Sequence, residues 1–291
     1  MSASMEAGTP VPGHPVAQTR VERAGQGDGG GEVLILRIVN AARMNPLTEQ
    51  LQRELLAHLD AARADPTARA LVLTGEGKAF CVGADLAGMS RTPSNGRTLG
   101  QETAAIMREG TNRLVLALRS MPMPVVVALN GAAAGAGVGL ALAGDLTVAS
   151  REAYFLMPFL PKLGIVPDMG SSWFLERRIG RARAMGMALL GDRIGAAQAA
   201  AWGLIWSAEA EDGTALEAQA LALAGRLAAT PPHAVLEARA LFEAAGSNDL
   251  ATQLGYEADR QCVLIDGAAF KEGVAAFRER REPVFGPREG G

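Results

Sequence analysis

The sequence predicts an α/β fold, in which a layer of strands and helices is followed by a helical C-terminal part. Three observations support this prediction. A strand, a helix and a second strand follow one another from residue 33 onward, further apolar runs of strand length occur at residues 124–129 and 145–149, and helix signals dominate from Ser171. The 291-residue chain is 48% hydrophobic and 20% charged, which provides enough apolar material for a large core and excludes overall disorder.

The strand–helix–strand motif begins the layer. Residues 33–39 are rich in β-branched side chains, and residues 70–74 form a second apolar run of strand length. Between these runs, apolar residues recur at helical spacing from Leu47 to Ala62, and Thr48 is in position to cap this helix. Such a unit implies a right-handed crossover and parallel pairing of the two strands.

Small and polar residues separate the elements that follow. Residues from Met89 to about Gln101 have a loop composition, and a helix to Leu118 is expected after them. The strand at 124–129 ends in a block of small residues, 130–139, from which an apolar helix starts. The later helical region is interrupted at Gly191, Gly203, Pro231-Pro232 and Gly246.

Composition divides the chain into three regions. Residues 1–30 are rich in glycine and proline and predict a flexible N-terminal tail. Residues 31–205 contain the predicted strands and their helices, so we expect the core and the site there. Residues 206–291 are predicted to form a helical C-terminal region.

Charge and composition exclude several classes of function. The net charge of −3 leaves no basic surplus for a phosphate backbone, so nucleic acid is not an expected partner. Cys81 and Cys262 cannot build a disulfide framework, the three histidines are scattered, and no cluster has metal-ligand spacing. No apolar stretch reaches the roughly 18 residues of a membrane-spanning helix, and the N-terminal residues lack a signal-peptide pattern. We therefore expect a cytoplasmic protein that binds neither metal nor membrane.

Two blocks of small residues follow predicted strands and can carry chemistry. They are residues 80–86 (Phe-Cys-Val-Gly-Ala-Asp-Leu) and 135–137 (Gly-Ala-Gly). Missing side chains let a ligand approach the backbone, and two converging N–H groups can hold a carbonyl oxygen that becomes negative. On spacing alone, tight strand–helix packing without a ligand is the favoured explanation of the same residues. Phosphate-binding motifs fail, because Val72 and Leu140 stand where the P-loop and the dinucleotide fingerprint need glycine.

With these blocks, the sequence resembles the enoyl-CoA hydratase/isomerase (crotonase) superfamily over roughly residues 33–286. The matching segments are residues 45–48, 65–66, 70–75, 78–86, 124–131, 134–137, 203–204 and 272–277, followed by Arg281, Pro283 and Phe285. The resemblance implies a crotonase-like spiral of ββα units, with the acyl-CoA site in residues 31–205 and a helical trimerisation region in residues 206–291. It implies an acyl-CoA thioester as substrate, no cofactor beyond the coenzyme A of that substrate, and a homotrimer or a dimer of trimers.

The resemblance also assigns roles to the two blocks. The backbone N–H groups of Ala84 and Ala136 match the oxyanion hole of the family, where two fixed dipoles stabilise an enolate. The glycines that accompany them as substrate-binding residues are Gly83, Gly135 and Gly137.

Hydratases of this family use two glutamates, and neither is present in this chain. The matching positions are Gly139 and either Phe159 or Leu160. Adding water to a double bond needs a base for the water and an acid for the carbon, so the two-glutamate mechanism is not supported. Cys81 is expected to be a small core residue rather than a nucleophile, because the resemblance assigns the chemistry to backbone groups.

Asp168 is the carboxylate that remains in a suitable position. Its segment, Pro167–Gly170, resembles the Pro-Asp-x-Gly segment of phenylacetate-pathway enoyl-CoA isomerases, and a related aspartate is the nucleophile of 4-chlorobenzoyl-CoA dehalogenase. An apolar wall of Phe159, Leu160 and Trp173 would raise the pKa of Asp168 if it is buried beside them. The structural alternative is that Asp168 caps the helix that follows.

The C-terminal segment supplies the remaining candidates. Phe277 and Arg280 match the part of the family that reaches coenzyme A, in some relatives from a neighbouring subunit. The alternatives are a core position for Phe277 and a solvated one for Arg280. Asp85 and Asp145 are expected to be structural acceptors.

The sequence therefore predicts an acyl-CoA thioester enzyme that stabilises an enolate, and specifically a double-bond isomerase that uses Asp168. One carboxylate is enough for this reaction, because it can take a proton from one carbon and return it to another. An enoyl-CoA hydratase, an Asp-nucleophile dehalogenase or thioester hydrolase, and a non-catalytic acyl-CoA-binding trimer stay open as alternatives. RNA binding conflicts with the net charge of −3.

Overall fold

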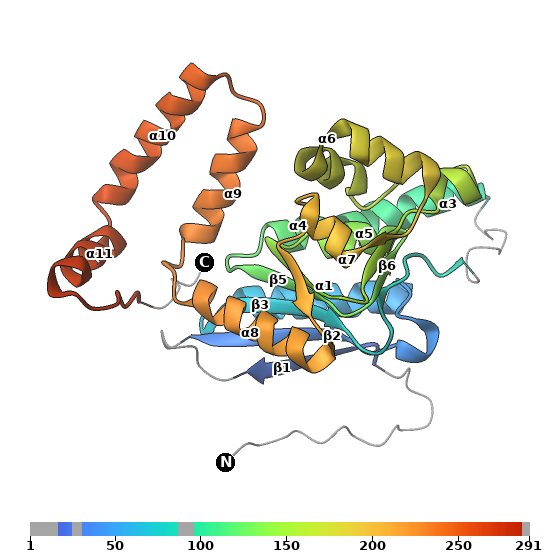
Figure 1. Cartoon of the computed structure of the whole chain (residues 1–291), viewed down its shortest axis with the longest axis horizontal. Coiled ribbons are helices and arrows are strands. Elements are labelled where there is room, and N and C mark those ends of the chain that lie inside the picture. Colours follow the sequence, from blue (N-terminus) through green and yellow to red (C-terminus); the bar gives the residue numbers. More distant parts are fainter. Residues whose placement is uncertain (1–16, 25–30, 87–95, 287–291) are drawn as a thin grey trace, which may run out of the picture.

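The computed structural model describes residues 17–24, 31–86 and 96–286, and these residues form an α/β core and a helical arm (Figure 1). The main sheet of the core has six strands. Its first pair is antiparallel and all further neighbours are parallel. In spatial order the strands are β1 (Thr19–Ala24), β2 (Glu32–Ile38), β3 (Ala68–Gly75), β5 (Val125–Leu129), β7 (Leu146–Ser150) and β10 (Ser207–Ala210).

A second sheet of four short strands accompanies the main sheet. Each of β3, β5 and β7 is followed by one short strand of the second sheet, and β6 leads directly into helix α5 (Ala136–Leu142). This repetition is the spiral of ββα units that the resemblance implied. The strands in spatial order are β4 (Ala79–Cys81), β6 (Ala132–Ala134), β8 (Tyr154–Leu156) and β9 (Ile194–Gly195).

The parallel strands are buried on both faces, as their continuous apolar sequences predict. One face of the main sheet packs with α1 (Glu49–Ala64) in the larger core cluster, and the other packs against α8 (Gly213–Ala228). Helix α1 begins where the sequence predicts, because the hydroxyl of Thr48 accepts a hydrogen bond from Leu51 N at 3.1 Å. The strand–helix–strand unit β2–α1–β3 is parallel, so that prediction is confirmed.

Further helices surround the second sheet. The helix expected to reach Leu118 is present as α3, a π-helical turn and α4, in immediate succession. Residues 87–95 of the loop expected before it lie outside the described residues. The bounds are α3 (Leu99–Ile106), the π-helical turn (Met107–Thr111), α4 (Asn112–Arg119), α6 (Ser171–Leu190) and α7 (Ala196–Ala201).

The arm consists of α9 (Ala234–Ala245), α10 (Leu250–Ile265) and α11 (Ala268–Glu279), and it projects away from the core (Figure 1). Arg239 on α9 attaches the arm to the core. Its guanidinium donates to both carboxylate oxygens of Asp145, at 2.7 and 2.6 Å, and also to the carbonyls of Arg119, Met121 and Met123. Asp145 is thus a structural acceptor, as expected.

Two of the predicted boundaries are wrong. Residues 19–24 of the expected flexible tail form β1, which pairs with β2 along its whole length and is tied to it through Arg37 and Glu22. Residues 1–16 and 25–30 lie outside the described residues. The boundary at residue 205 falls too early, because β10 is the sixth strand of the main sheet and α8 buries apolar side chains against that sheet.

Candidate active site

Two loops with small residues meet at the ends of neighbouring strands. β4 and β6 are adjacent and parallel, so the segments that follow them leave the second sheet at the same edge. The approach is close: a Cβ on Gly83 would lie 2.8 Å from Ala136 N, and a Cβ on Gly137 would lie 2.1 Å from the carbonyl oxygen of Cys81. Only glycine fits at these two positions, so the structure brings the two predicted blocks together.

The backbone conformation of both blocks requires glycine as well. Gly83 has φ of 83° and Gly135 has φ of 53°, a region that other residues rarely adopt. The Gly135 N–H donates to Leu156 O at 2.9 Å, and Gly135 O accepts from Val138 N at 3.0 Å. These bonds fix the turn from which Ala136 starts α5.

Two backbone donors are left free by this arrangement. Ala136 is the first residue of α5, so its N–H has no partner within the helix. Within the described part of the chain, no hydrogen bond involves the N–H of Ala84 or that of Ala136. Two such donors on adjoining loops are suited to hold one carbonyl oxygen.

Asp168 lies on the segment that precedes α6. Its Oδ1 is buried and has no hydrogen-bond partner among the described residues. Burial raises the pKa of Asp168 to about 6, while a hydrogen bond with its own backbone N–H acts in the opposite direction. A carboxylate of this kind is poised to exchange a proton near neutral pH.

Helix capping does not explain Asp168. The residue before α6 is Gly170, and no side chain caps this helix. The backbone carbonyl of Asp168, rather than its carboxylate, accepts hydrogen bonds from Ser171 N at 2.9 Å and from the Ser171 hydroxyl at 2.7 Å. The capping alternative is therefore wrong, and Oδ1 of the carboxylate has no hydrogen-bond partner among the described residues.

Gly139 connects the Asp168 segment to the helix that starts at Ala136. It lies about one helical turn beyond Ala136 on α5. A Cβ at this position would be 2.3 Å from Met169 O and 2.6 Å from Met169 Cβ. The residue next to Asp168 thus occupies the space that a glutamate at position 139 would need, a contact that sequence reasoning missed.

The residues that match the second glutamate of the family hydratases are also apolar in this chain. Phe159 is buried in a π-helical turn at Phe159–Leu163, and its Cζ would lie 3.9 Å from a Cβ on Gly135. Leu160 follows it and is half-buried. Phe159 therefore lies beside the turn at Gly135, and its role in substrate binding stays a prediction.

Three predicted site residues are not brought into this region. Trp173 is on the exposed side of α6, where its ring contacts Phe174 edge-on and the guanidinium of Arg177 lies 4.0 Å from the ring centroid. Phe277 is 85% exposed on α11 and Arg280 is exposed at the end of that helix, so a core position for Phe277 is wrong. In a single chain, neither α11 residue reaches the loops.

The two remaining chemical candidates have structural explanations. Cys81 is fully buried, and burial raises the pKa of its thiol to about 12, which removes it as a nucleophile. Asp85 pairs with Arg43 at 2.8 Å, as expected of a structural acceptor. No three His, Cys, Asp or Glu residues within the described ranges are grouped so as to hold a metal ion.

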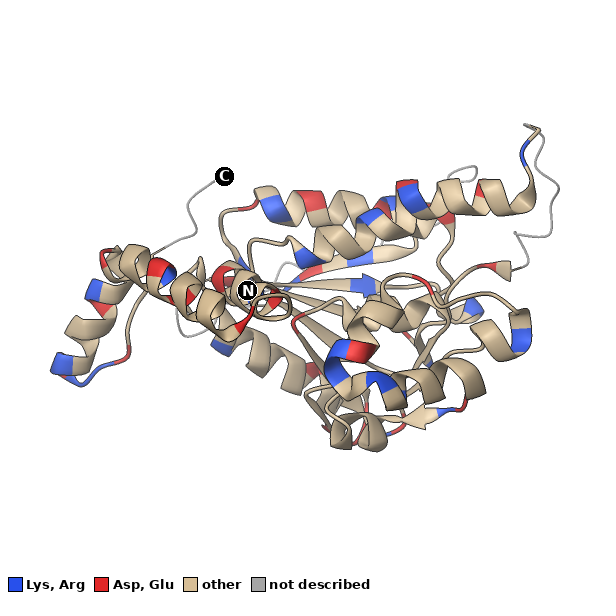
Figure 2. Ribbon diagram, turned by 90° about the horizontal axis from the view of Figure 1, so that it is seen from above, with Lys and Arg blue, Asp and Glu red and all other residues tan. Residues whose placement is uncertain are grey.

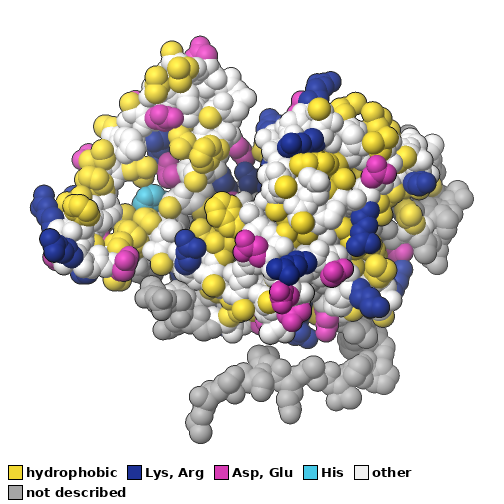
Figure 3. All heavy atoms as spheres, viewed as in Figure 1, with side chains coloured by type: hydrophobic (Ala, Val, Ile, Leu, Met, Phe, Trp, Pro, Cys, Tyr) yellow, Lys and Arg dark blue, Asp and Glu magenta, His cyan; other side chains and the backbone are white. Residues whose placement is uncertain are grey.

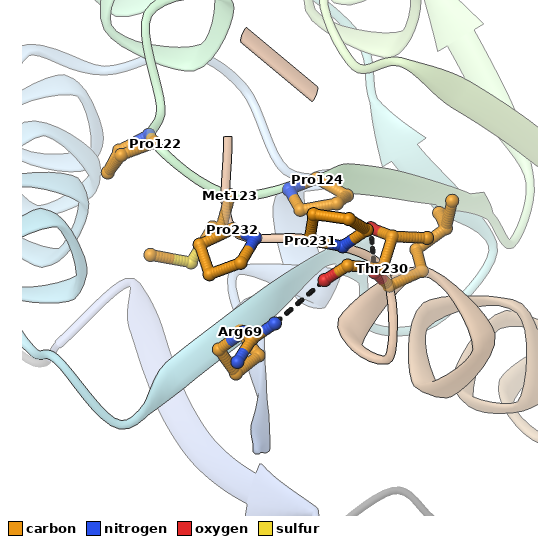
Figure 4. Close-up of a pocket in the computed structure, with 8 residues that line it drawn as sticks. Arg69, Pro122, Met123, Pro124, Thr230, Pro231 and Pro232 are labelled. Atoms are coloured by element: carbon orange, nitrogen blue, oxygen red, sulfur yellow. Dashed lines mark hydrogen bonds between the residues drawn. The ribbon is translucent and has the colours of Figure 1, made fainter. Parts of the chain in front are cut away.

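Two cavities lie away from these loops. One, of about 10 Å³, is enclosed by Pro122, Pro124, Pro231 and Arg69, which donates to Thr230 O at 2.8 Å (Figure 4). It has room for about one water molecule. A second, of about 250 Å³, lies between β1, β2 and α1. Neither contains any of the proposed site residues.

Figure 2 shows basic and acidic positions interspersed along the ribbon of the described residues. None of the described helices is long and apolar enough to span a bilayer.

Comparisons with known proteins agree with the fold. The family model for enoyl-CoA hydratase/isomerase matches residues 28–288. A probable enoyl-CoA hydratase of Rhodobacter capsulatus is 44% identical, with 83% of this chain and 90% of that protein covered. The 1,2-epoxyphenylacetyl-CoA isomerase of Escherichia coli is 40% identical, with 87% and 94% covered.

Solved structures support the same assignment. A crystal structure of an enoyl-CoA hydratase from Polaromonas has a TM-score of 0.81 at 34% identity, with 91% of this chain and 99% of that chain covered. The resemblance seen in the two small-residue blocks therefore extends over the whole crotonase fold. The chain belongs to the enoyl-CoA hydratase/isomerase family, whose members act on acyl-CoA thioesters.

Proposed function

We propose that this chain is an enoyl-CoA double-bond isomerase in which Asp168 moves the proton and the N–H groups of Ala84 and Ala136 hold the thioester oxygen. The single observation that supports it most is the Asp168 carboxylate, with a buried Oδ1 that has no partner among the described residues. A buried polar atom without a partner is costly, so its retention calls for a purpose other than stability.

The reaction needs no second acid or base. The carboxylate of Asp168 takes a proton from one carbon beside the double bond, and the electrons move onto the thioester oxygen to give a dienolate. The two backbone N–H groups stabilise that negative charge. Protonated Asp168 then returns the proton to the other end of the dienolate. A pKa of about 6 makes Asp168 a carboxylate at neutral pH and an effective acid once protonated.

The coenzyme A moiety enters as part of the substrate, and the chemistry proposed here requires no other cofactor and no metal. We place the protein in the cytoplasm, where acyl-CoA thioesters would be met. Phosphate-binding motifs are missing from the sequence, so recognition of the coenzyme would fall to less specific contacts.

We propose a homotrimer, or a dimer of trimers, as the assembly. The arm exposes a large apolar surface, part of which is visible in Figure 3. In such an assembly Phe277 and Arg280 would meet coenzyme A bound to a neighbouring subunit. Light scattering of the purified protein tests the assembly. The exposed apolar residues of the arm include Leu236, Phe242, Leu250, Leu254, Val263, Phe270 and Phe277.

Hydration is the alternative function, and the probable hydratase of Rhodobacter capsulatus is the observation that favours it. Against it, the glutamate positions are occupied by Gly139 and by Phe159 or Leu160. For hydration, Asp168 alone would have to remove a proton from the attacking water and also donate a proton to the carbon.

The test uses two substrates in separate reactions, a 3-enoyl-CoA and a 2-enoyl-CoA. We expect isomerisation of the first with no gain of the mass of water, and little hydration of the second. Asp168→Asn should lower kcat by roughly 10²–10⁴-fold, the usual contribution of one acid–base residue. Asp266→Asn, at an exposed helix end, is the matched control and should keep full activity. Unchanged turnover in Asp168→Asn would disprove the proposal, and a 3-hydroxyacyl product from the second substrate would favour the alternative.

A further inference from the structure

The direction of the Ala84 N–H is set by a hydrogen bond on the other side of its peptide. Gly83 O accepts from Leu47 N at 2.8 Å, and Leu47 and Ala84 form a parallel bridge. In a planar trans peptide the C=O and the following N–H point in opposite directions. Because Gly83 O faces Leu47, the N–H of Ala84 faces away from it.

Gln52 on α1 holds Leu47 from its other side. Its Nε2 donates to Leu47 O at 3.1 Å, and the residue is only 6% exposed. A Cβ on Gly110 would lie 2.1 Å from Gln52 Oε1, so the π-helical turn carries a glycine where this side chain needs room. Leu47 is therefore fixed by hydrogen bonds at both its N–H and its C=O.

Asn45 holds the strand that leads into the loop. Its side chain is fully buried, and Nδ2 donates to Ala79 O at 2.7 Å and to Glu76 O at 3.0 Å. Ala79 is the first residue of β4, and Gly83 follows this strand closely. Asn45 has φ of 57°, a left-handed conformation that asparagine tolerates better than most residues.

We propose that Gln52 and Asn45 are positioning residues of the oxyanion hole, which hold Leu47 and β4 so that the Ala84 N–H points at the thioester oxygen. This inference rests on the proposed function only in its use of that oxygen. Neither side chain touches the substrate. Gln52 acts through its hydrogen bond to Leu47. Asn45 acts through one hydrogen bond to the β3–β4 turn and one to the first residue of β4. Both effects reach the Ala84 N–H through the Gly83–Ala84 peptide plane.

The expected signature is a weaker polarisation of the bound carbonyl. Complete loss of one oxyanion donor lowers kcat by roughly 10²–10³-fold, so a misdirected donor should lower it by less, about 10-fold. Substrate binding should change by no more than about 2-fold, because most of the binding contacts are elsewhere on the thioester.

The experiment measures the infrared carbonyl stretch of butyryl-CoA, labelled with ¹³C at the thioester carbon, bound to the full-length protein. This saturated thioester does not isomerise, so the measurement is independent of turnover. Wild type should shift the band to lower frequency. Gln52→Leu and Asn45→Gly should each reverse part of that shift, and Asp168→Asn should keep all of it. Asn45→Gly retains the left-handed backbone and removes only the amide.

Matched controls separate positioning from general destabilisation. Gln253→Leu removes two hydrogen bonds on the arm, from Gln253 Nε2 to Leu241 O at 3.4 Å and from Asn248 Nδ2 to Gln253 Oε1 at 3.0 Å, and should leave the band in place. Gln52→Met serves if Gln52→Leu does not fold. A full shift in folded Gln52 and Asn45 variants would overturn the positioning proposal. No shift in wild type would overturn the oxyanion hole itself, and with it the proposed function.

Discussion

The proposed site has two halves, the backbone of the glycine loops and the side chain of Asp168, and packing supports the first but not the second. The proposed oxyanion half consists of backbone groups in places where even one added carbon would collide, such as Gly137 against Cys81 O at 2.1 Å. The Asp168 half consists of one side chain whose buried oxygen has no partner in the described chain. In the first half, function and stability depend on the same packing, whereas in the second they oppose each other. Substitutions should therefore have different consequences on the two sides.

The largest effect is expected for Gly137→Ala. The new methyl group would meet backbone rather than a movable side chain, so we expect a loss of roughly 3 kcal/mol or more in the free energy of unfolding, together with loss of activity. Urea denaturation measures the first. Gly186→Ala is the control, since nothing lies within 4 Å of a Cβ in that helix and a small gain in stability is expected. Equal stability of the two variants would contradict the close-packed account.

Gly139→Ala tests the contact between the halves. Its methyl group would press on Met169, which lies in a segment without helix or strand structure, whereas the Cys81 that faces Gly137 belongs to β4. We expect about 1–2 kcal/mol of destabilisation but a fall in isomerase kcat of at least 10-fold, because Asp168 would be displaced. Wild-type kcat in this variant would show that Met169 does not position Asp168.

Asp168→Asn should raise the free energy of unfolding at neutral and higher pH, whereas the two glycine substitutions lower it. The pKa of Asp168 is raised to about 6 in the folded chain, above its unfolded value of 3.8. The folded state then binds more protons than the unfolded state between these values, so stability decreases as pH rises through this window, by roughly 1–3 kcal/mol in total. Asn cannot ionise, so the variant should be more stable than wild type at pH 8 and lose that advantage below about pH 4. A less stable variant at pH 8 would mean that the carboxylate has a structural partner.

Sequence reasoning reached the oxyanion half more completely than the Asp168 half. Continuous apolar runs predicted β2, β3, β5 and β7, and the two glycine blocks predicted a shared loop region, because local composition determines both. Strand β1 was missed since four of its six residues are polar, and the three-residue strand β6 is too short and alanine-rich to give a strand signal.

The remaining features that the sequence did not predict depend on tertiary contacts. The exposure of Trp173 and Phe277 depends on which face of a helix meets the core, which aromatic character alone does not reveal. Gly139 and Met169 are thirty positions apart in the sequence, so no local sequence pattern predicts their contact. Asp168 was selected because it is the remaining carboxylate in a suitable position, and the structure was needed to exclude capping.

The pH dependence of kcat/KM for isomerisation of a 3-enoyl-CoA tests the central claim most directly, because it reports ionisation of the free enzyme. If Asp168 must be a carboxylate to take the first proton, kcat/KM should be constant above its pKa and fall tenfold per pH unit below about 6. A profile that stays flat from pH 5 to pH 8, or one that is unaltered by Asp168→Asn, would contradict the assignment of Asp168 as the proton-transfer group.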